Sequence, residues 1–343
     1  MSDMQNDFGK YASQPDRRAS AKISRETVSA ILVFSITALL FLSSRSISPH
    51  LGTLSHVQTV LMLASFLVVL SFGQGLVILS GGLDLSLPAV ITLGGVLATS
   101  INGSGSIPDS FIIPLVVLCC GIVGLFSALG VVWLKVPPFI MTMATSIIVA
   151  SVALGATKGT PRGVSPDILL TLMKTHVFGV PTPIAFTLAF VVAGWTLQSR
   201  TAFGKHLYAV GTNATASRIA GLPVTTTQIV PYIVSAACAG FVGMMLVGYS
   251  NGATLRMGEA YMLPSIAAVV IGGSSILGGS GSFIGSVGGA LLLTTLGTII
   301  SALGIDLGVR TIIEGSIILL ALLLLRDEVF QKVRTSWKSS PKN

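Results

Sequence analysis

Charged side chains are scarce in this chain of 343 residues. Asp, Glu, Lys and Arg together account for 9% of the positions, whereas apolar residues account for 52%, and the mean hydropathy is +0.87. Soluble domains typically carry about 25% charged residues. A chain with so little charge cannot cover a water-facing surface of its own size, which excludes a soluble globular protein.

Groups that support catalysis or hold a cofactor are also few. The three cysteines, Cys119, Cys120 and Cys238, lie inside apolar segments without a Cys-x-x-Cys spacing, and the four histidines are scattered. Cysteines in such a setting are typical of buried apolar positions. The sequence lacks the Gly-x-x-x-x-Gly-Lys-Ser/Thr string of a phosphate-binding loop. We therefore expect no metal, no cofactor and no catalysis, including ATP hydrolysis, within this chain.

The net charge of +8 does not indicate a nucleic-acid partner. Lys and Arg are dispersed between the apolar segments and at the two ends of the chain, where positive charge orients a membrane protein. Residues 1–26 are polar and of mixed charge, without an apolar run that leads to a small-residue cleavage site. We expect them to form a retained cytoplasmic tail rather than a cleaved signal peptide.

Long apolar segments are what the sequence has in abundance. A helix needs about 20 apolar residues to cross the hydrocarbon core of a bilayer, and short alternating segments, the pattern of a membrane β-barrel, are not found. The prediction is an all-α polytopic bundle of about ten spans. Three of the segments, 87–101, 137–157 and 260–275, are short or contain Gly or Pro, so eight or nine spans remain possible. The ten segments are 27–44, 57–80, 87–101, 111–134, 137–157, 181–197, 226–249, 260–275, 283–302 and 311–325.

The distribution of positive charge predicts the orientation. If the N-terminus is cytoplasmic, ten spans place 14 of the 20 Lys and Arg residues in cytoplasmic pieces. Such an excess is what the retention of basic segments in the cytoplasm produces. The predicted organisation is a cytoplasmic tail at 1–26, a single transmembrane domain at 27–325 with a cytoplasmic loop at 198–224, and a second cytoplasmic tail at 326–343.

The string at residues 80–90 joins two of these segments. Gly81 and Gly82 permit backbone conformations that end a helix, while Asp84 and Ser86 can cap the next helix and Pro88 suits its first turn. A carboxylate in lipid costs about 2.5–3.5 kcal/mol, so Asp84 is expected to face a loop, a protein-lined cavity or backbone donors. Both a helix cap and a role in binding substrate or protons remain open for Asp84.

A second string, at residues 266–290, is rich in glycine. Its Gly-x-Gly at 279–281 matches part of a dinucleotide-binding fingerprint, but no βαβ context accompanies it. Gly281, Gly285 and Gly289 recur every four residues, and small residues at this spacing let two helices approach closely. Close packing of helices is favoured over contact with a ligand.

The polar loop at 198–224 is long compared with the other predicted cytoplasmic connections. Residues 212–220 can form a short helix, with Thr212 or Asn213 as its cap and Gly221 as its stop. Together with Arg200, Lys205 and Arg218, this helix predicts a docking surface for a soluble partner. A solvated linker is the alternative.

Ionisable residues are otherwise rare within the apolar segments. Glu314 lies in the last segment with Arg310 four residues earlier, which favours a structural ion pair over an ion-coupling site. An ion-coupled secondary transporter is expected to carry ionisable residues near the middle of the membrane. Only Asp84 and Glu314 are candidates, so this alternative is disfavoured.

The three strings together resemble the permease subunit of bacterial ABC sugar importers of the ribose, xylose and autoinducer-2 type. The family shows a Gly-Gly-(Ile/Leu)-Asp-Leu-Ser string, found here at 81–86, and a Tyr-Ala-(Ile/Val)-Gly-x-Asn-x-x-Ala-x-x-x-Gly loop, found at 208–221 with Ala220 before the final glycine. Its third string, Ala-Ala-Val-Val-(Leu/Ile)-Gly-Gly-x-Ser-x-x-Gly-Gly-x-Gly-Ser, is found at 267–282. The resemblance covers roughly residues 30–325. Pro88 departs from the small residue that the family usually has there.

The resemblance implies a permease of the inner membrane that works with other subunits. These are a second permease subunit, the same or different, an ABC ATPase, and a periplasmic sugar-binding protein. A permease of the branched-chain amino-acid class is the nearest alternative. The residues implied in coupling to the ATPase are Tyr208, Gly211, Asn213, Ala216, Arg218 and Gly221. The residues implied in the translocation pathway, or in packing beside it, are Gly81, Gly82, Asp84, Ser86, Gly272, Gly273, Gly278, Gly279 and Gly281.

Overall fold

The computed structural model describes residues 25–105 and 107–306, together with 308–309, 311–313, 315–316 and 319. Most of both predicted tails and of the segment 311–325 lies outside the described residues, as does the expected pair of Arg310 and Glu314. The helices are α1 (Arg25–Ile47), α2 (Leu54–Leu79), α3 (Leu87–Ser104), α4 (Asp109–Val132), α5 (Pro138–Thr157), α6 (Asp167–Lys174), α7 (Thr182–Arg200), α8 (Ala202–Thr212), α9 (Ala214–Ile219), α10 (Val224–Ser250), the 3₁₀ turn η2 (Glu259–Tyr261), α11 (Met262–Ile271) and α12 (Phe283–Ala302).

The chain is an all-α polytopic membrane protein. Seven of the described helices, α1, α2, α4, α5, α7, α10 and α12, are long and apolar enough to cross a membrane. The predicted segments 87–101 and 260–275 correspond to shorter apolar helices, and the second of them ends at Ile271 because residues 272–282 leave the helix. The predicted segment 137–157 is one continuous helix, since Pro137 and Pro138 stand at its start and do not interrupt it.

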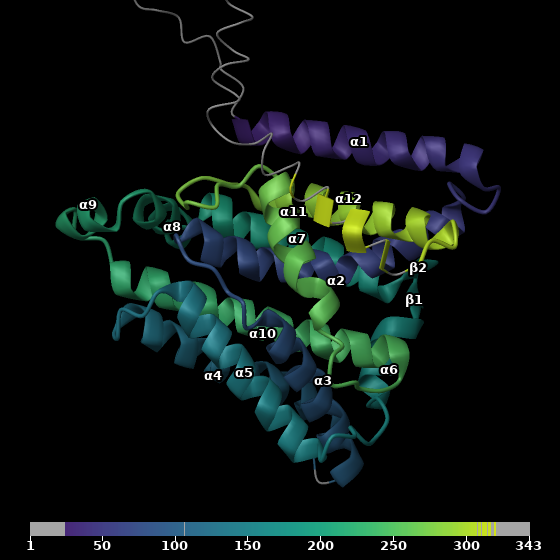
Figure 1. The fold of residues 1–343 in the computed structure, drawn as a ribbon, viewed down its shortest axis with the longest axis horizontal. Helices are drawn as coiled ribbons and strands as arrows, with labels where there is room; N and C mark the ends of the chain where they lie inside the picture. The colour runs from purple at the N-terminus through teal and green to yellow at the C-terminus, as the bar shows by residue number, and fades with distance from the viewer. Residues whose placement is uncertain are drawn as a thin grey trace, which may run out of the picture.

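The packing of the bundle is centred on α10. This helix contacts α2, α3 and α4, while α12 lies between α1, α2 and α11. Small residues permit these contacts: Gly124 of α4 packs against the backbone of Tyr232 and Ile233 in α10, and Gly240 packs against Cys120. The middle of the molecule is therefore occupied by α2 and α10, whereas α1 and α5 lie at its edges with mostly exposed apolar side chains (Figure 1).

The two ends of the bundle differ in structure. One end carries α8 and α9, which project beyond the long helices (Figure 1). The other end carries α6 and a two-stranded antiparallel hairpin formed by β1 (His176–Val177) and β2 (Val180–Pro181). We call these the α8–α9 end and the hairpin end. The hairpin is an addition to the all-α prediction, and its four residues are too few to have produced an alternating pattern in the sequence.

Two segments of irregular backbone enter the bundle from opposite ends. Residues 80–86 connect α2, which ends at the α8–α9 end, to α3, and residues 251–258 return from the end of α10 to η2 and α11. Helix α3 packs alongside α10 with Gly94 against Gly240 and the Ile91 carbonyl against Gly243. Pro88 lies six residues before Gly94 and three before Ile91, so it falls at the level of about residues 234 to 240 of α10, around the middle of that helix. Gly258 packs directly on Pro88, so the second segment reaches the same depth.

Candidate functional site

The predicted docking loop is folded into two helices, α8 and α9. The Asn213 side chain caps α9 by accepting a hydrogen bond from the Ala216 N–H at 2.9 Å, and Gly221 follows the helix with a φ of +78°. The predicted cap and stop are thus confirmed. The prediction missed α8, whose first residues follow Thr201; the Thr201 side chain accepts a hydrogen bond from the Gly204 N–H at 3.2 Å.

The three strings of the sequence meet at the α8–α9 end. The Tyr208 hydroxyl of α8 donates a hydrogen bond to the Gly281 carbonyl at 2.6 Å, and the Gly279 N–H donates to the Leu79 carbonyl at the end of α2 at 3.0 Å. Gly211 lies between them, and a Cβ at this position would overlap the Leu79 carbonyl. A backbone contact this close requires glycine, so α8 is held against both glycine-containing strings.

Gly81 and Gly273 end their helices in the same way. After α2, the N–H groups of Gly81 and Gly82 donate to the carbonyls of Ile78 and Val77. After α11, the N–H groups of Gly273 and Ser274 donate to those of Val270 and Val269. Both glycines have positive φ, +85° and +95°. Each is a helix stop with a left-handed residue, which turns the chain beneath α8.

The remaining glycines of the third string make close backbone contacts. Gly278 packs on Gly81, and Gly272 packs on Gly285. The predicted helical face of Gly281, Gly285 and Gly289 is wrong at its first member, because Gly281 precedes α12 with a φ of +155°. Gly285 and Gly289 do lie on α12, where they pack against the backbone of Gly272 and Ala268.

Asp84 is buried in the middle of the bundle, with 2% of its surface exposed. Its Oδ1 accepts hydrogen bonds from the Ser86 N–H at 2.9 Å and the Ser86 hydroxyl at 2.6 Å, and its Oδ2 accepts from the Ser235 hydroxyl of α10 at 2.8 Å. Neither predicted cap forms a side-chain bond to the first turn of α3, because Asp84 and Ser86 bond to each other and to α10 instead. Pro88 does lie in that first turn.

Several polar side chains of this region were not predicted. Thr142 of α5 accepts a hydrogen bond from the Leu85 N–H at 3.1 Å, which supports the irregular backbone of residues 80–86. The Gln198 Oε1 at the end of α7 accepts from the Phe283 N–H at 2.7 Å and so caps the start of α12 from 85 positions away. Such contacts join distant parts of the chain and leave no local pattern in the sequence.

Ile219 is another residue that the sequence did not single out. It ends α9 with 83% of its surface exposed, next to exposed Arg218. Gly221 and Ala216 are also exposed, as is Asn213. The projecting tip of α9 therefore presents an apolar side chain beside a positive charge, a combination suited to a protein partner.

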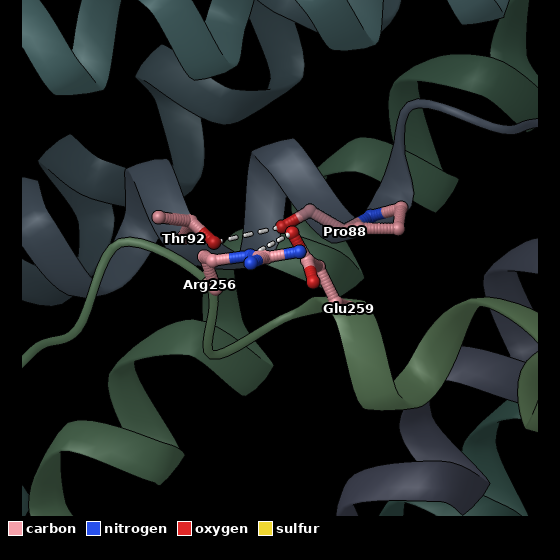
Figure 2. A network of polar contacts seen from close by, with 4 residues as sticks. All are labelled: Pro88, Thr92, Arg256 and Glu259. Carbon is pink, nitrogen blue, oxygen red and sulfur yellow. Dashed lines mark hydrogen bonds and ion pairs between the residues drawn. The ribbon is translucent and has the colours of Figure 1, made fainter. Parts of the chain in front are cut away.

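A third group, Arg256 and Glu259, lies where the second irregular segment meets α3. The Arg256 Nε is 2.6 Å from the Glu259 Oε1, and their side chains are 81% and 55% exposed. Figure 2 shows the pair beside the first turn of α3, where the Thr92 hydroxyl donates to the Pro88 carbonyl at 3.0 Å.

Among the residues that the structure describes, no group of three or more His, Cys, Asp or Glu side chains could hold a metal ion. The α8–α9 end instead joins a projecting pair of short helices to the ends of α2, α11 and α12 through close contacts.

Comparison with known proteins places this arrangement in context. A family described as the permease component of branched-chain amino acid transport systems matches residues 57–325. The chain is 34% identical over 262 residues to a probable ABC transporter permease protein, y4mJ, of Sinorhizobium fredii, covering 76% of this chain and 78% of that protein. It is 33% identical over 263 residues to the ribose import permease protein RbsC of Bacillus subtilis, covering 76% and 81%. It is 27% identical over 301 residues to the autoinducer 2 import system permease protein LsrD of Photorhabdus luminescens, covering 86% and 89%.

Proposed function

The chain belongs to the family of permease components of branched-chain amino acid transport systems, and we propose that it imports a sugar or a related polyol as part of an ABC transporter. It is a multi-pass protein of the inner membrane and a transport subunit. The observation that carries the proposal is the meeting of the three strings beneath α8, since this geometry couples a docking surface to the helices of the bundle.

The substrate class is supported by the names of the relatives. Two of the similar proteins are named as permeases for the import of ribose, a sugar, and of autoinducer 2.

The partner at the α8–α9 end is an ABC ATPase. The tip of α9 offers Arg218 and Ile219 to a groove of the ATPase, while α8 transmits its displacement through Tyr208 and Gly211 to the ends of α2 and α12. A short, capped helix transmits force because its ends are fixed by hydrogen bonds. We assign this end to the cytoplasm because the distribution of Lys and Arg predicts a cytoplasmic N-terminus and a cytoplasmic loop at 198–224, and α1 begins at this end (Figure 1).

Other partners act at the hairpin end and beside the bundle. A periplasmic sugar-binding protein delivers the solute at the hairpin end, and a second permease subunit completes the pathway between two bundles. The proposed organisation remains about ten spans with both termini in the cytoplasm, as the excess of Lys and Arg in the predicted cytoplasmic pieces indicates. Asp84, Ser86 and the glycines of the first and third strings pack beside the pathway and hold α3 and α11 in place.

Transport in proteoliposomes tests the proposal. The permease, reconstituted with its ATPase and binding protein, should accumulate labelled ribose when ATP is supplied, and an ionophore should leave uptake unchanged. Labelled leucine serves as the probe for an amino-acid permease. Uptake of leucine in place of ribose, or uptake by the permease alone under an ion gradient, would refute the proposal.

The docking surface has its own test. Arg218→Glu in α9 and Gly221→Val just after it should abolish ribose uptake while the permease still inserts into the membrane, because the ATPase no longer engages the bundle. Arg218→Lys, which keeps the positive charge at the same place, is the control and should retain uptake. Normal ATP-driven uptake by the α9 variants would show that this loop is not the docking surface.

A further inference from the structure

The pair Arg256–Glu259 lies at an unusual depth for exposed charges. Ser235, whose hydroxyl bonds to Asp84, is eleven residues from the start of α10 and fifteen from its end, about 16 Å and about 22 Å along the helix. Pro88 lies near this level, and Gly258 packs on Pro88. Arg256 and Glu259 are two residues and one residue from Gly258, so their backbones lie within about 7 Å of it. The pair is thus near the middle of the bundle.

The exposure of this pair contrasts with that of other mid-level surfaces. Exposed side chains on α5 at comparable depth are apolar: Ile147 is 63% exposed and Val152 is 57% exposed. An Arg or an acidic side chain in contact with lipid at that depth is strongly unfavourable in free energy. A surface that presents both groups therefore does not face lipid.

Two surroundings remain, a dry contact with protein or a water-filled space. Removing a paired Arg and Glu from water costs more free energy than their mutual attraction returns, unless further hydrogen bonds are supplied. Among the described residues Arg256 and Glu259 have only each other as side-chain hydrogen-bond partners, and more than half of each side chain is exposed. In a water-filled space, water molecules supply the hydrogen bonds that both side chains need.

On the basis of the proposed import function, we propose that Arg256 and Glu259 line the translocation pathway and bind the hydroxyl groups of the passing solute. Guanidinium groups donate hydrogen bonds in a fixed fork, and carboxylates only accept them. A sugar hydroxyl both donates and accepts, so neighbouring hydroxyls can bridge the two side chains. The pair has no net charge, which matches a neutral solute.

The packing around the pair supports this role. Met257 packs against Gly95 of α3, and Gly258 leaves no room for a side chain beside Pro88. These contacts hold the loop against α3, beside which Figure 2 shows Arg256 and Glu259. Both of these side chains are more than half exposed. The loop is thus a fixed platform on which the two charged groups face away from the chain's own interior.

Cysteine accessibility tests the location. In a chain with Cys119, Cys120 and Cys238 replaced by Ala, Glu259→Cys should react with a membrane-impermeant thiosulfonate at least about tenfold faster than Ile147→Cys, since thiols react as hydrated thiolates. Ile147→Cys is the matched control, exposed at mid-depth on an apolar surface. Equal, slow reaction of both variants would overturn the proposal and would show that the pair faces lipid or a dry protein contact.

Transport kinetics test the binding of solute. In reconstituted transporter, Glu259→Gln should lower ribose uptake about tenfold or more, by the loss of a charged acceptor, while ATP hydrolysis stimulated by the binding protein persists. Unchanged uptake would overturn the binding role. If the wild-type protein shows no ATP-driven ribose uptake, the proposed import function is wrong. If the wild-type protein takes up ribose but the Glu259 variants behave like it, only the proposed role of Arg256 and Glu259 is wrong.

Discussion

The two irregular segments at the middle of the bundle use charge in opposite ways. Residues 80–86 direct Asp84 inward, where three hydrogen bonds from Ser86 and Ser235 satisfy it. Residues 251–258 and the following turn direct Arg256 and Glu259 outward, where they contact each other and remain open. Near the middle of the bundle, one charged side chain is therefore buried in hydrogen bonds with the protein, and two others are exposed. The difference indicates that the first segment fixes the bundle, while the second provides the surface for the solute.

The largest expected effect concerns Gly211, which packs against the end of α2 where residues 80–86 begin. Gly211→Ala should abolish ATP-driven uptake and lower stability by about 3 kcal/mol, because the new Cβ overlaps the Leu79 carbonyl and the backbone has to move. Thermal unfolding in detergent and ribose uptake measure the two effects.

Gly155→Ala is the matched control, since Gly155 also lies in a helix but has open space around its Cα. This change should leave uptake intact and keep or slightly raise stability. Equal effects of the two substitutions would mean that α8 is not held against the end of α2 as the structure has it.

The next largest expected effect is the loss of stability on replacing Asp84, the inward-facing carboxylate. Asp84→Ala leaves the Ser86 and Ser235 donors buried without an acceptor, which should lower stability by about 2–3 kcal/mol. The Tm in detergent reports the loss. Asp167→Ala, at the exposed start of α6, should change the Tm by little. A Tm for Asp84→Ala within error of that control would remove the distinction between the two segments.

The smallest expected effect on stability is that of replacing Glu259, the outward-facing carboxylate. Glu259→Gln should leave the Tm unchanged, because an exposed ion pair contributes little to stability. The comparison with Asp84→Ala in the same detergent is the measurement. A large drop in Tm for Glu259→Gln would show that Glu259 stabilises the fold, as Asp84 does. The two segments would then not differ in the way that we propose.

Much of the architecture was predictable because it depends on local properties. The apolar segments, the cap at Asn213 and the stops at Gly81 and Gly221 follow from hydropathy and from backbone preferences within a few residues. The glycine face at 281–289 was partly wrong because the start of α12 is set by Ser282 and by Gln198, a residue 85 positions earlier. Spacing alone did not reveal where the loop ends and the helix begins.

The sequence by itself determined that this protein lies in a membrane, where its long apolar helices run and which strings carry the resemblance to permeases. Only the tertiary structure decided which residues meet: Tyr208 bonds to Gly281 across 73 positions, and Asp84 bonds to Ser235 across 151. It also decided that Asp84 faces inward while Arg256 and Glu259 face outward. The physical reason is that hydropathy and capping act over one or two helical turns, whereas the surroundings of a charge depend on which distant helices pack beside it.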